Sequence, residues 1–479
     1  MTRSLATVGI LAFLVGCTTV GPDYRAPDAQ ALGVPQGWNA PSASSAPAGD
    51  LATWWRKLGD ATLDSLIEQA LANNRDVAVA QARLREARAR RDFANANRFP
   101  TLGATASALR SRSSEQLGGG NSRSLFVAGF DAQWEPDLFG GQRRAVEAAE
   151  ADLAATQDDV DATRVSLAAE VARNYVDVRG FQARLALARA NLDTQLETLQ
   201  ITEWRTQAGL TTSLDVEQAR AAAEQTRALI PVLENSLAGA RHRIAILAGA
   251  APGSFDAVLA TAAPIPAVPA GIAVGIPADT LRQRPDLRAA ERRVAAETAR
   301  VGVQAAAAYP NLSLNGTIGL ESLTLAGLTH GGALASQIAA QLVTTVFDAG
   351  RIRNQVEIQT AVQERALHTY EGAVLAALED VENALVALDN AERRRTALET
   401  AVSAARNAAL YASQRYAAGI TDFQTVLDTQ RTVLTVEDSL ASIEADRAAA
   451  LIQLYKALGG GWATGTPTAT ARPGQQREG

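Results

Sequence analysis

Apolar residues recur along this chain with two different spacings, and each spacing predicts a different kind of element. Leu63–Asn97 carries its apolar residues on one helical face, and Pro100, which cannot continue a helix, follows it. Phe126, Phe130 and Trp134 then share one side of a two-residue alternation whose other side is mostly polar. The pattern therefore predicts a helix followed by a two-faced strand.

Four segments show such an alternation, two in each half of the chain. They cover about 101–114, 124–136, 311–325 and 333–346. Alternating segments of about ten residues separated by turns are typical of membrane-spanning β-strands. An ordinary half-buried antiparallel sheet produces the same alternation, so the strands by themselves leave both interpretations open.

A long helical run follows the second strand of each half. The two runs cover 141–208 and 350–418, contain no Pro and have one internal Gly each. At a rise of 1.5 Å per residue, such a run makes a rod of about 100 Å. An Ala-Gly turn at Gly209 or Gly419 ends each run, and a shorter helix returns. Runs of this length predict a coiled coil or a helical bundle.

The two halves are copies of one another. Landmark residues recur 210 positions apart, as in Asp76 and Asp286, Pro100 and Pro310, Gly209 and Gly419, and Gly249 and Gly459. In each copy the predicted order of elements is a helix, two strands, a long helix and a shorter helix. We therefore predict a first repeat over 61–250, a Pro- and Ala-rich linker over 251–275, a second repeat over 276–462 and a disordered tail over 463–479.

Composition narrows the possible functions. The net charge of −6 argues against a general nucleic-acid binder, which needs a basic face. One Cys and three His argue against a metal site built from those residues. Phosphate-binding loops, dinucleotide fingerprints and the His-Glu-x-x-His pair are absent from the sequence. We predict a protein that is not an enzyme and that uses no cofactor and no metal.

The amino terminus has the features of an export signal over residues 1–16, with an apolar core from Leu5 to Val15. Leu14-Val15-Gly16-Cys17 resembles the bacterial lipobox, in which the Cys receives diacylglyceryl and N-acyl lipid and becomes the mature terminus. A plain signal peptide with a chance Cys is the alternative. We predict a lipid-anchored segment over 17–60, and Thr18, where Asp would favour the inner membrane, indicates the outer membrane.

If the four strands cross a bilayer, one chain cannot form the whole structure. A sheet in lipid cannot leave its edges unpaired, because each unsatisfied N–H or C=O group costs several kcal/mol. Closed membrane barrels need about eight strands or more. Two chains would supply eight strands and three would supply twelve, which leaves room for a pore. The residues therefore predict an oligomeric channel with a long helical duct, and they leave the number of chains open.

The sequence resembles the TolC/OprM-type outer-membrane efflux proteins, in particular their lipoprotein branch, which is called NodT-like. The resemblance is carried by Cys17-Thr18-Thr19-Val20-Gly21-Pro22-Asp23-Tyr24, by Trp54-Trp55 with Asp60, Leu63, Leu66-Ile67 and Ala70-Leu71, by Leu281-Arg282-Gln283-Arg284-Pro285-Asp286-Leu287-Arg288-Ala289-Ala290-Glu291, and by Val426-Leu427-Asp428-Thr429-Gln430-Arg431. Together these stretches extend over nearly all of the mature chain.

The resemblance implies a fold that is mainly α with a membrane β-barrel. Three copies would form a twelve-stranded barrel in the outer membrane and an α-helical barrel in the periplasm. It also implies partners: two further copies of the chain, outer-membrane lipid, a periplasmic adaptor protein, and an inner-membrane pump of the resistance-nodulation-division type.

The resemblance further implies a gate near the second Ala-Gly turn. Asp428 matches the acidic ring of the family, Arg431 the nearby basic residue, and Tyr416 a tyrosine that ties neighbouring helices. Thr425 stands where some members have a second Asp, and Gln424 where others have a constricting Leu. Three copies of Asp428 at a constriction would repel one another and attract cations.

Glu217 and Arg220 have the analogous spacing in the first copy and are weaker gate candidates. For all of these charged residues the alternative is a solvated helix face with pairs three residues apart.

These observations predict the exit duct of a tripartite efflux pump, which passively conducts small molecules or drugs across the outer membrane. One alternative is the exit duct of a type I protein-secretion system, which has the same fold. A lipid-anchored coiled-coil protein that tethers layers of the envelope is an alternative of another class. A tether needs no barrel, so the alternating strands disfavour it.

Overall fold

The computed structural model describes residues 19–40, 51–114, 116, 120, 122–269 and 274–462. The predicted signal, Cys17 and the tail over 463–479 lie outside these residues. The chain divides into two compact units, each drawn from both repeats. Unit 1 comprises Met1–Pro27, Ala82–Gln157 and Arg288–Gly372, and unit 2 comprises Asp28–Gln81, Asp158–Leu287 and Ala373–Gly479.

Each repeat contains the predicted order of helix, two strands, long helix and returning helix. The first has η1 (Trp54–Leu58), α2 (Ala61–Asn73), α3 (Arg75–Ala96), β1 (Thr101–Arg112), β2 (Ser122–Trp134), α4 (Gly141–Gln207) and α5 (Ser213–Leu247). After α6 (Asp256–Ala260), the second has α7 (Pro277–Gln283), α8 (Pro285–Ala306), β3 (Asn311–Ser322), η3 (Ala326–Thr329), β4 (Leu334–Val343), α9 (Arg351–Ala417) and α10 (Phe423–Ala457).

The duplication extends to the lengths of the helices. Both long helices, α4 and α9, have 67 residues, and both returning helices, α5 and α10, have 35. The predicted repeat and its mainly helical character are therefore confirmed. Among the described residues, no helix combines the length and apolar character needed to cross a membrane.

One predicted helix is wrong. The run Leu63–Asn97 forms two helices, α2 and α3, because Asn74 takes an extended conformation between them. Its side-chain oxygen accepts hydrogen bonds from the amides of Asp76 and Val77 and so caps α3. Its side-chain amide donates to the carbonyl oxygen of Leu247 at 2.9 Å, which fixes the break against the end of α5.

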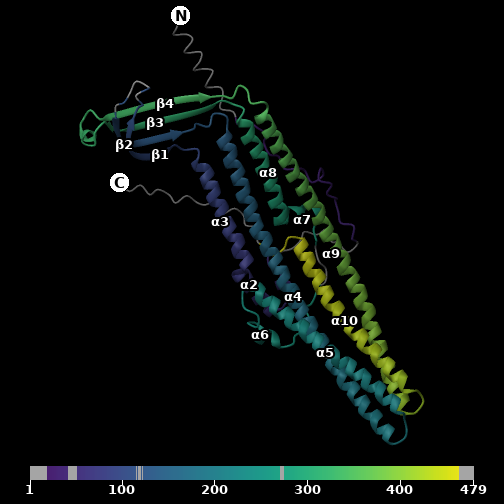
Figure 1. Cartoon of the computed structure of the whole chain (residues 1–479). Helices are drawn as coiled ribbons and strands as arrows, with labels where there is room; N and C mark the ends of the chain where they lie inside the picture. The colour runs from purple at the N-terminus through teal and green to yellow at the C-terminus, as the bar shows by residue number, and fades with distance from the viewer. Residues whose placement is uncertain are drawn as a thin grey trace, which may run out of the picture. The chain divides into compact units, whose positions relative to one another are not determined.

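The strands of unit 1 form a single antiparallel sheet in the order β1-β2-β3-β4 (Figure 1). Phe130 of β2 lies opposite Ala104 of β1 and Ile318 of β3, so all three side chains share one face. The other described strand residues of this apolar face, apart from those at the outer ends, are Leu102, Ala106, Ala108, Phe126, Ala128, Ala132, Trp134, Leu312, Leu314, Gly316, Leu320, Leu334, Ser336, Ile338, Ala340 and Leu342. The opposite face is mostly polar.

Unit 2 contains the main hydrophobic core. Fully buried side chains of η1, α2, α4, α5 and α10 meet there. Trp54 stacks on Tyr455 with ring centroids 5.1 Å apart. The Tyr175 hydroxyl donates a 2.6 Å hydrogen bond to Asp60, whose other carboxylate oxygen caps the start of α2. The Trp54-Trp55 motif with Asp60, which carries part of the resemblance, is therefore a packing and capping motif of this core.

Candidate functional site

One face of the sheet in unit 1 is apolar and exposed, as is typical of a surface that contacts lipid. Its apolar face is exposed over large side chains, among them Leu102, Phe130 and Ile338 with 74%, 55% and 91% of their surface accessible. Such a contiguous apolar surface indicates contact with lipid or with another protein. β1 and β4 are the two edges of the sheet, and neither pairs with a further strand among the described residues.

The described amino-terminal segment is held against the junction of β2 and α4. The Val20 amide donates to the Phe139 carbonyl at 3.1 Å. The Arg144 side chain, only 5% exposed, donates to the carbonyls of Val20 and Gly21 and to the carboxylate of Asp23. Buried charge-assisted hydrogen bonds of this kind fix the direction of an otherwise extended segment.

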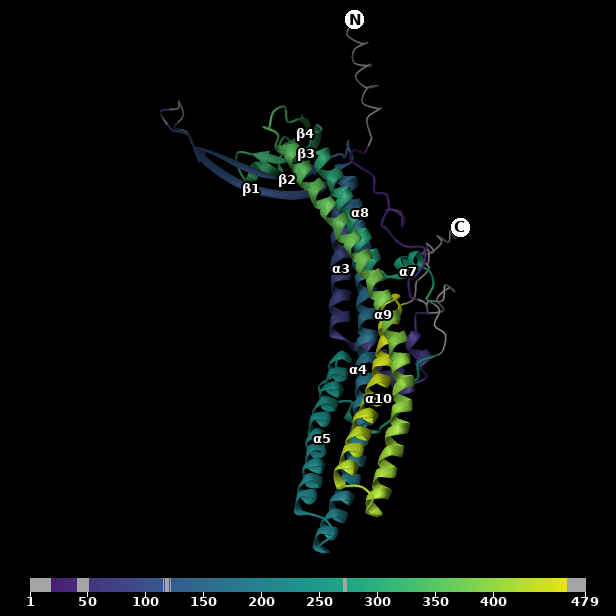
Figure 2. The ribbon, with the colours of Figure 1, turned by 90° about the vertical axis from the view of Figure 1, so that its right-hand side faces the viewer.

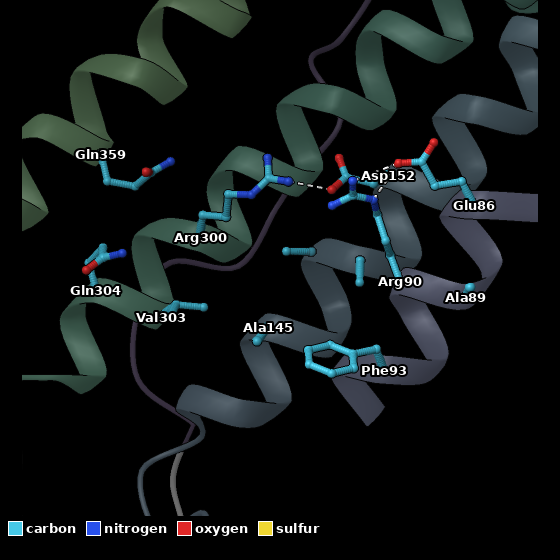
Figure 3. A pocket seen from close by; sticks show the side chains of 12 residues that line it. Glu86, Ala89, Arg90, Phe93, Ala145, Asp152, Arg300, Val303, Gln304 and Gln359 are labelled. Atoms are coloured by element: carbon cyan, nitrogen blue, oxygen red, sulfur yellow. Dashed lines mark hydrogen bonds and ion pairs between the residues drawn. The ribbon is translucent and has the colours of Figure 1, made fainter. Parts of the chain in front are cut away.

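A groove of about 670 Å³ lies among α3, α4, α8 and α9 within unit 1 (Figure 3). Its wall carries Arg90, which donates to Glu86 at 2.7 Å, and Arg300, which pairs with Asp152. Burial raises the pKa of Asp152, and the positive charge of Arg300 opposes that shift. The groove thus presents charges of both signs beside small apolar side chains.

At one end of unit 2, the turn between α4 and α5 lies beside the turn between α9 and α10 (Figure 2). Gly209 and Gly419 form these turns with φ of 73° and 71°, values that favour glycine. A capping box of Thr212 and Asp215 begins α5, and Asp422 caps α10 through the Thr425 amide. The two copies build their turns in the same way, from different capping residues.

The second-copy gate candidates that the structure brings together lie at the start of α10. The Gln424 side-chain amide donates to Asp428 at 2.9 Å, and Arg431 lies 3.6 Å from the same carboxylate. The Thr425 hydroxyl donates to Asp422 at 2.6 Å. The side chains of Asp428 and Arg431 are 59% and 47% exposed, so groups from outside the chain can also reach them.

Tyr416 occupies a different position: it is half-buried and packs against a buried apolar cluster formed by residues of α5, α9 and α10. Its ring lies 5.4 Å from that of Phe423. The Arg205 guanidinium of α4 lies over the Tyr416 ring, 4.5 Å from its centroid. The Tyr416 hydroxyl is buried and has no hydrogen-bond partner within the described part of the chain.

The first-copy candidates form an exposed ion-pair group. Arg220 donates to Glu217 at 2.7 Å and lies 3.3 Å from Glu203 of α4. This group links α5 to α4. Exposed pairs of this kind contribute little to stability, roughly 0–1 kcal/mol.

The family model for outer membrane efflux proteins matches residues 66–250 and 276–460 of the chain, one match per repeat. The chain belongs to the outer membrane efflux protein family. It acts in efflux and is an outer-membrane protein.

Relatives of the chain match over almost their whole length. The pyoverdine export outer membrane protein OpmQ of Pseudomonas putida is 33% identical over 97% of this chain and 99% of its own. The outer membrane protein OprJ of Pseudomonas aeruginosa is 30% identical over 97% and 98%. The nodulation protein T of Rhizobium leguminosarum is 32% identical over 94% and 95%.

Solved channel structures have the same fold. The outer-membrane channel OprN superimposes with a TM-score of 0.87 at 36% identity, over 92% of this chain and 99% of its own. The VceC protein of Vibrio cholerae superimposes with a TM-score of 0.81 at 27% identity, over 87% and 100%. The predicted fold of a TolC/OprM-type channel is therefore confirmed.

Sequence reasoning missed Arg205 in this efflux protein. Its contact with Tyr416 joins α4 of the first repeat to α9 of the second, so no local spacing points to it. Arg205 precedes the turn glycine Gly209 by four residues, as Arg415 precedes Gly419, and this symmetry was the available signal.

Proposed function

We propose that three copies of this chain form the exit duct of a tripartite efflux pump, through which small molecules pass passively out of the cell. The twelve strands of the three sheets would close a barrel in the outer membrane. The long helices would form a helical barrel in the periplasm.

The observation that carries this proposal is the two-faced sheet with open edges. An apolar face on one side and a polar face on the other suits a wall between lipid and water. The free edges of β1 and β4 would each expose a row of unpaired backbone groups in lipid, and only further strands satisfy them. Pairing β1 of one copy with β4 of the next satisfies both edges at once.

We place the adaptor-docking surface at the two turns. Leu210, Leu214 and Ile420 expose 69%, 64% and 64% of their surface there. The energy for transport would come from an inner-membrane pump, which we expect to be of the resistance-nodulation-division type. Relatives named for pyoverdine export and for toluene efflux support small molecules as the cargo over secreted proteins.

We place the gate at Asp428, with Arg431 and Gln424 as its immediate neighbours. Within one chain these residues already hold the carboxylate in place. In a symmetric ring, Arg431 of one copy would reach Asp428 of the next and close the constriction. Tyr416, Thr425, Glu217 and Arg220 would support the same end of the helices.

We also propose that Cys17 carries diacylglyceryl and N-acyl lipid. Thr19 and Val20 lie against Gly140 and Phe139, in the segment that connects β2 to α4. A lipid on Cys17, two residues before Thr19, would lie close to the level at which the strands enter the membrane.

The test is conductance of the purified mature protein in planar bilayers, together with its migration in detergent gels before and after heating. A duct gives discrete channels and an oligomer that shifts on heating. A lipid-anchored tether gives neither result, and that outcome would refute the proposal.

A further inference from the structure

Two arginines lie on the apolar face of the sheet, at the end of β1 that is remote from its connection to α3. They are Arg110 and Arg112, and both are exposed. We propose that they form a binding site for lipid phosphate groups in the outer leaflet of the membrane. The inference rests on the proposed membrane-spanning sheet.

The register of β1 and β2 places the arginines among hydroxyl groups. Arg110 lies opposite Ser124 and Arg112 lies opposite Ser122, so each pair projects from the same face. Side chains that lie directly opposite in antiparallel strands have Cβ atoms about 4.5–5.5 Å apart. A bound phosphate could therefore meet guanidinium and hydroxyl donors together, and arginine binds phosphate through two parallel hydrogen bonds.

The distance along the strand puts this group at the edge of the apolar band. From Trp134, at the end of the sheet next to the helices, to Ser124 is ten residue steps, or about 34 Å at roughly 3.4 Å per residue. With a strand tilt of about 40° this corresponds to about 26 Å across the membrane, and the apolar band of membrane barrels is about 25 Å tall. Arg110 therefore lies where acyl chains end and headgroups begin.

Among the described strand residues, the charged ones on this face are Arg110 and Arg112. Of the described strand residues, the acidic ones are Asp131 and Glu321, and they pair with Gly103, Thr317 and Val127 on the polar face. An arginine within the acyl region destabilises a barrel, and this cost falls to nearly nothing at the interface. Two arginines at that level suit an anionic headgroup, to which basic residues near a membrane surface are attracted.

The chain supplies a matched control. Arg123 lies on β2 between Ser122 and Ser124, at the same end of the same hairpin, but it pairs with Ser111 on the polar face. Arg123→Gln therefore removes the same charge at nearly the same depth without touching the proposed site.

The experiment titrates the full mature protein in nonionic detergent with bisphosphoryl lipid A and counts bound lipid by native mass spectrometry. We expect Arg110→Gln together with Arg112→Gln to weaken binding about 25-fold, or roughly five-fold for each arginine. Arg123→Gln should bind like the unchanged protein. For the unchanged protein, lipid A from which both phosphates have been removed should bind no better than phosphatidylcholine.

Planar-bilayer conductance checks that each variant still forms channels. If the double glutamine variant does not assemble, Arg110→Lys with Arg112→Lys keeps the charge and should weaken binding less than ten-fold. Equal binding by the double variant and the unchanged protein would overturn the proposal. Equal weakening of lipid A binding by Arg123→Gln would also overturn it. So would binding of lipid A that does not change when both phosphates are removed. Each of these results can occur while the channel still conducts. If the unchanged protein forms no conducting channels, by contrast, the proposed duct itself is refuted.

Discussion

Replacing Arg205 by Gln is expected to loosen the end of the helices at which the gate is proposed. The guanidinium of Arg205 lies 4.5 Å from the centroid of the Tyr416 ring and joins α4 to α9 there. Gln keeps much of the length of the side chain and removes the charge. The variant therefore tests the attraction between the cation and the ring more than the packing around it.

The magnitude follows from the surroundings of the pair. A cation over an aromatic ring contributes about 0.5–1 kcal/mol at exposed sites and about 2 kcal/mol when desolvated. Both side chains are half-buried, and Tyr416 packs on a cluster that contains Phe423. We therefore expect a loss of about 1 kcal/mol per chain, which is roughly a five-fold change in an equilibrium. If three copies open together, the losses add to about 3 kcal/mol, or roughly 150-fold.

The assay is the fraction of time that single channels spend open in a planar bilayer at fixed voltage and salt. Arg205→Gln should raise this fraction between five-fold and 150-fold, and the size of the effect reports whether the copies open independently or together. Arg227→Gln is the control, because Arg227 forms an exposed ion pair with Glu224 on α5 and its loss makes the same change in charge.

An open fraction equal to that of the unchanged protein in Arg205→Gln would refute the reasoning. An equal rise in both variants would attribute the effect to net charge and would also refute it. Arg205→Lys retains a cation but not the planar group, so its open fraction should lie between those of the unchanged protein and Arg205→Gln.

Gly249→Ala should lower the thermal midpoint of helical unfolding more than Gly209→Ala. Both residues have φ near 72°, which disfavours Ala by roughly 1–2 kcal/mol, but only a Cβ at 249 would meet the Asn73 carbonyl, at 2.3 Å. Equal midpoints by circular dichroism would contradict this. Asp428→Ala should raise the closed-state conductance or antibiotic entry into cells, and an unchanged conductance would count against the gate. Burial raises the pKa of Asp215, but hydrogen bonds from Thr211 and from the Thr212 amide outweigh it, and the net pKa lies below the ordinary value of 3.8. This carboxylate should therefore stabilise the start of α5 above about pH 4 and lose that effect as the pH falls through its lowered pKa. Below that pH the protection factors of the α5 amides, which correct for the pH dependence of intrinsic exchange, should fall in the unchanged protein but not in Asp215→Asn, and the same pH dependence in the two proteins would refute this.

The strands and their faces could be predicted because alternation is a local property. Phe126, Phe130 and Trp134 project from one face in any extended chain, whatever lies around it. The break at Asn74 could not be predicted in the same way. No Pro or Gly marks it, and its side chain is held by the Leu247 carbonyl, which lies far away in the sequence.

The residues around the proposed gate also include some that the sequence could group and one that it could not. Gln424, Asp428 and Arg431 are neighbours on one helix face, and their spacing of three or four residues was sufficient to group them. Arg205 belongs to another repeat, and only the packing of α4 beside α9 brings it to Tyr416.

By itself, the sequence determined the duplicated order of elements, the lengths of the long helices and the two faces of each strand, since these follow from the period of apolar residues and the positions of Pro and Gly. Only the tertiary structure decided the order of the strands in the sheet, the partner of Tyr416 and the register that places Arg110 opposite Ser124. Such pairings depend on which distant segments meet, and the chain's local conformational preferences carry no information about that.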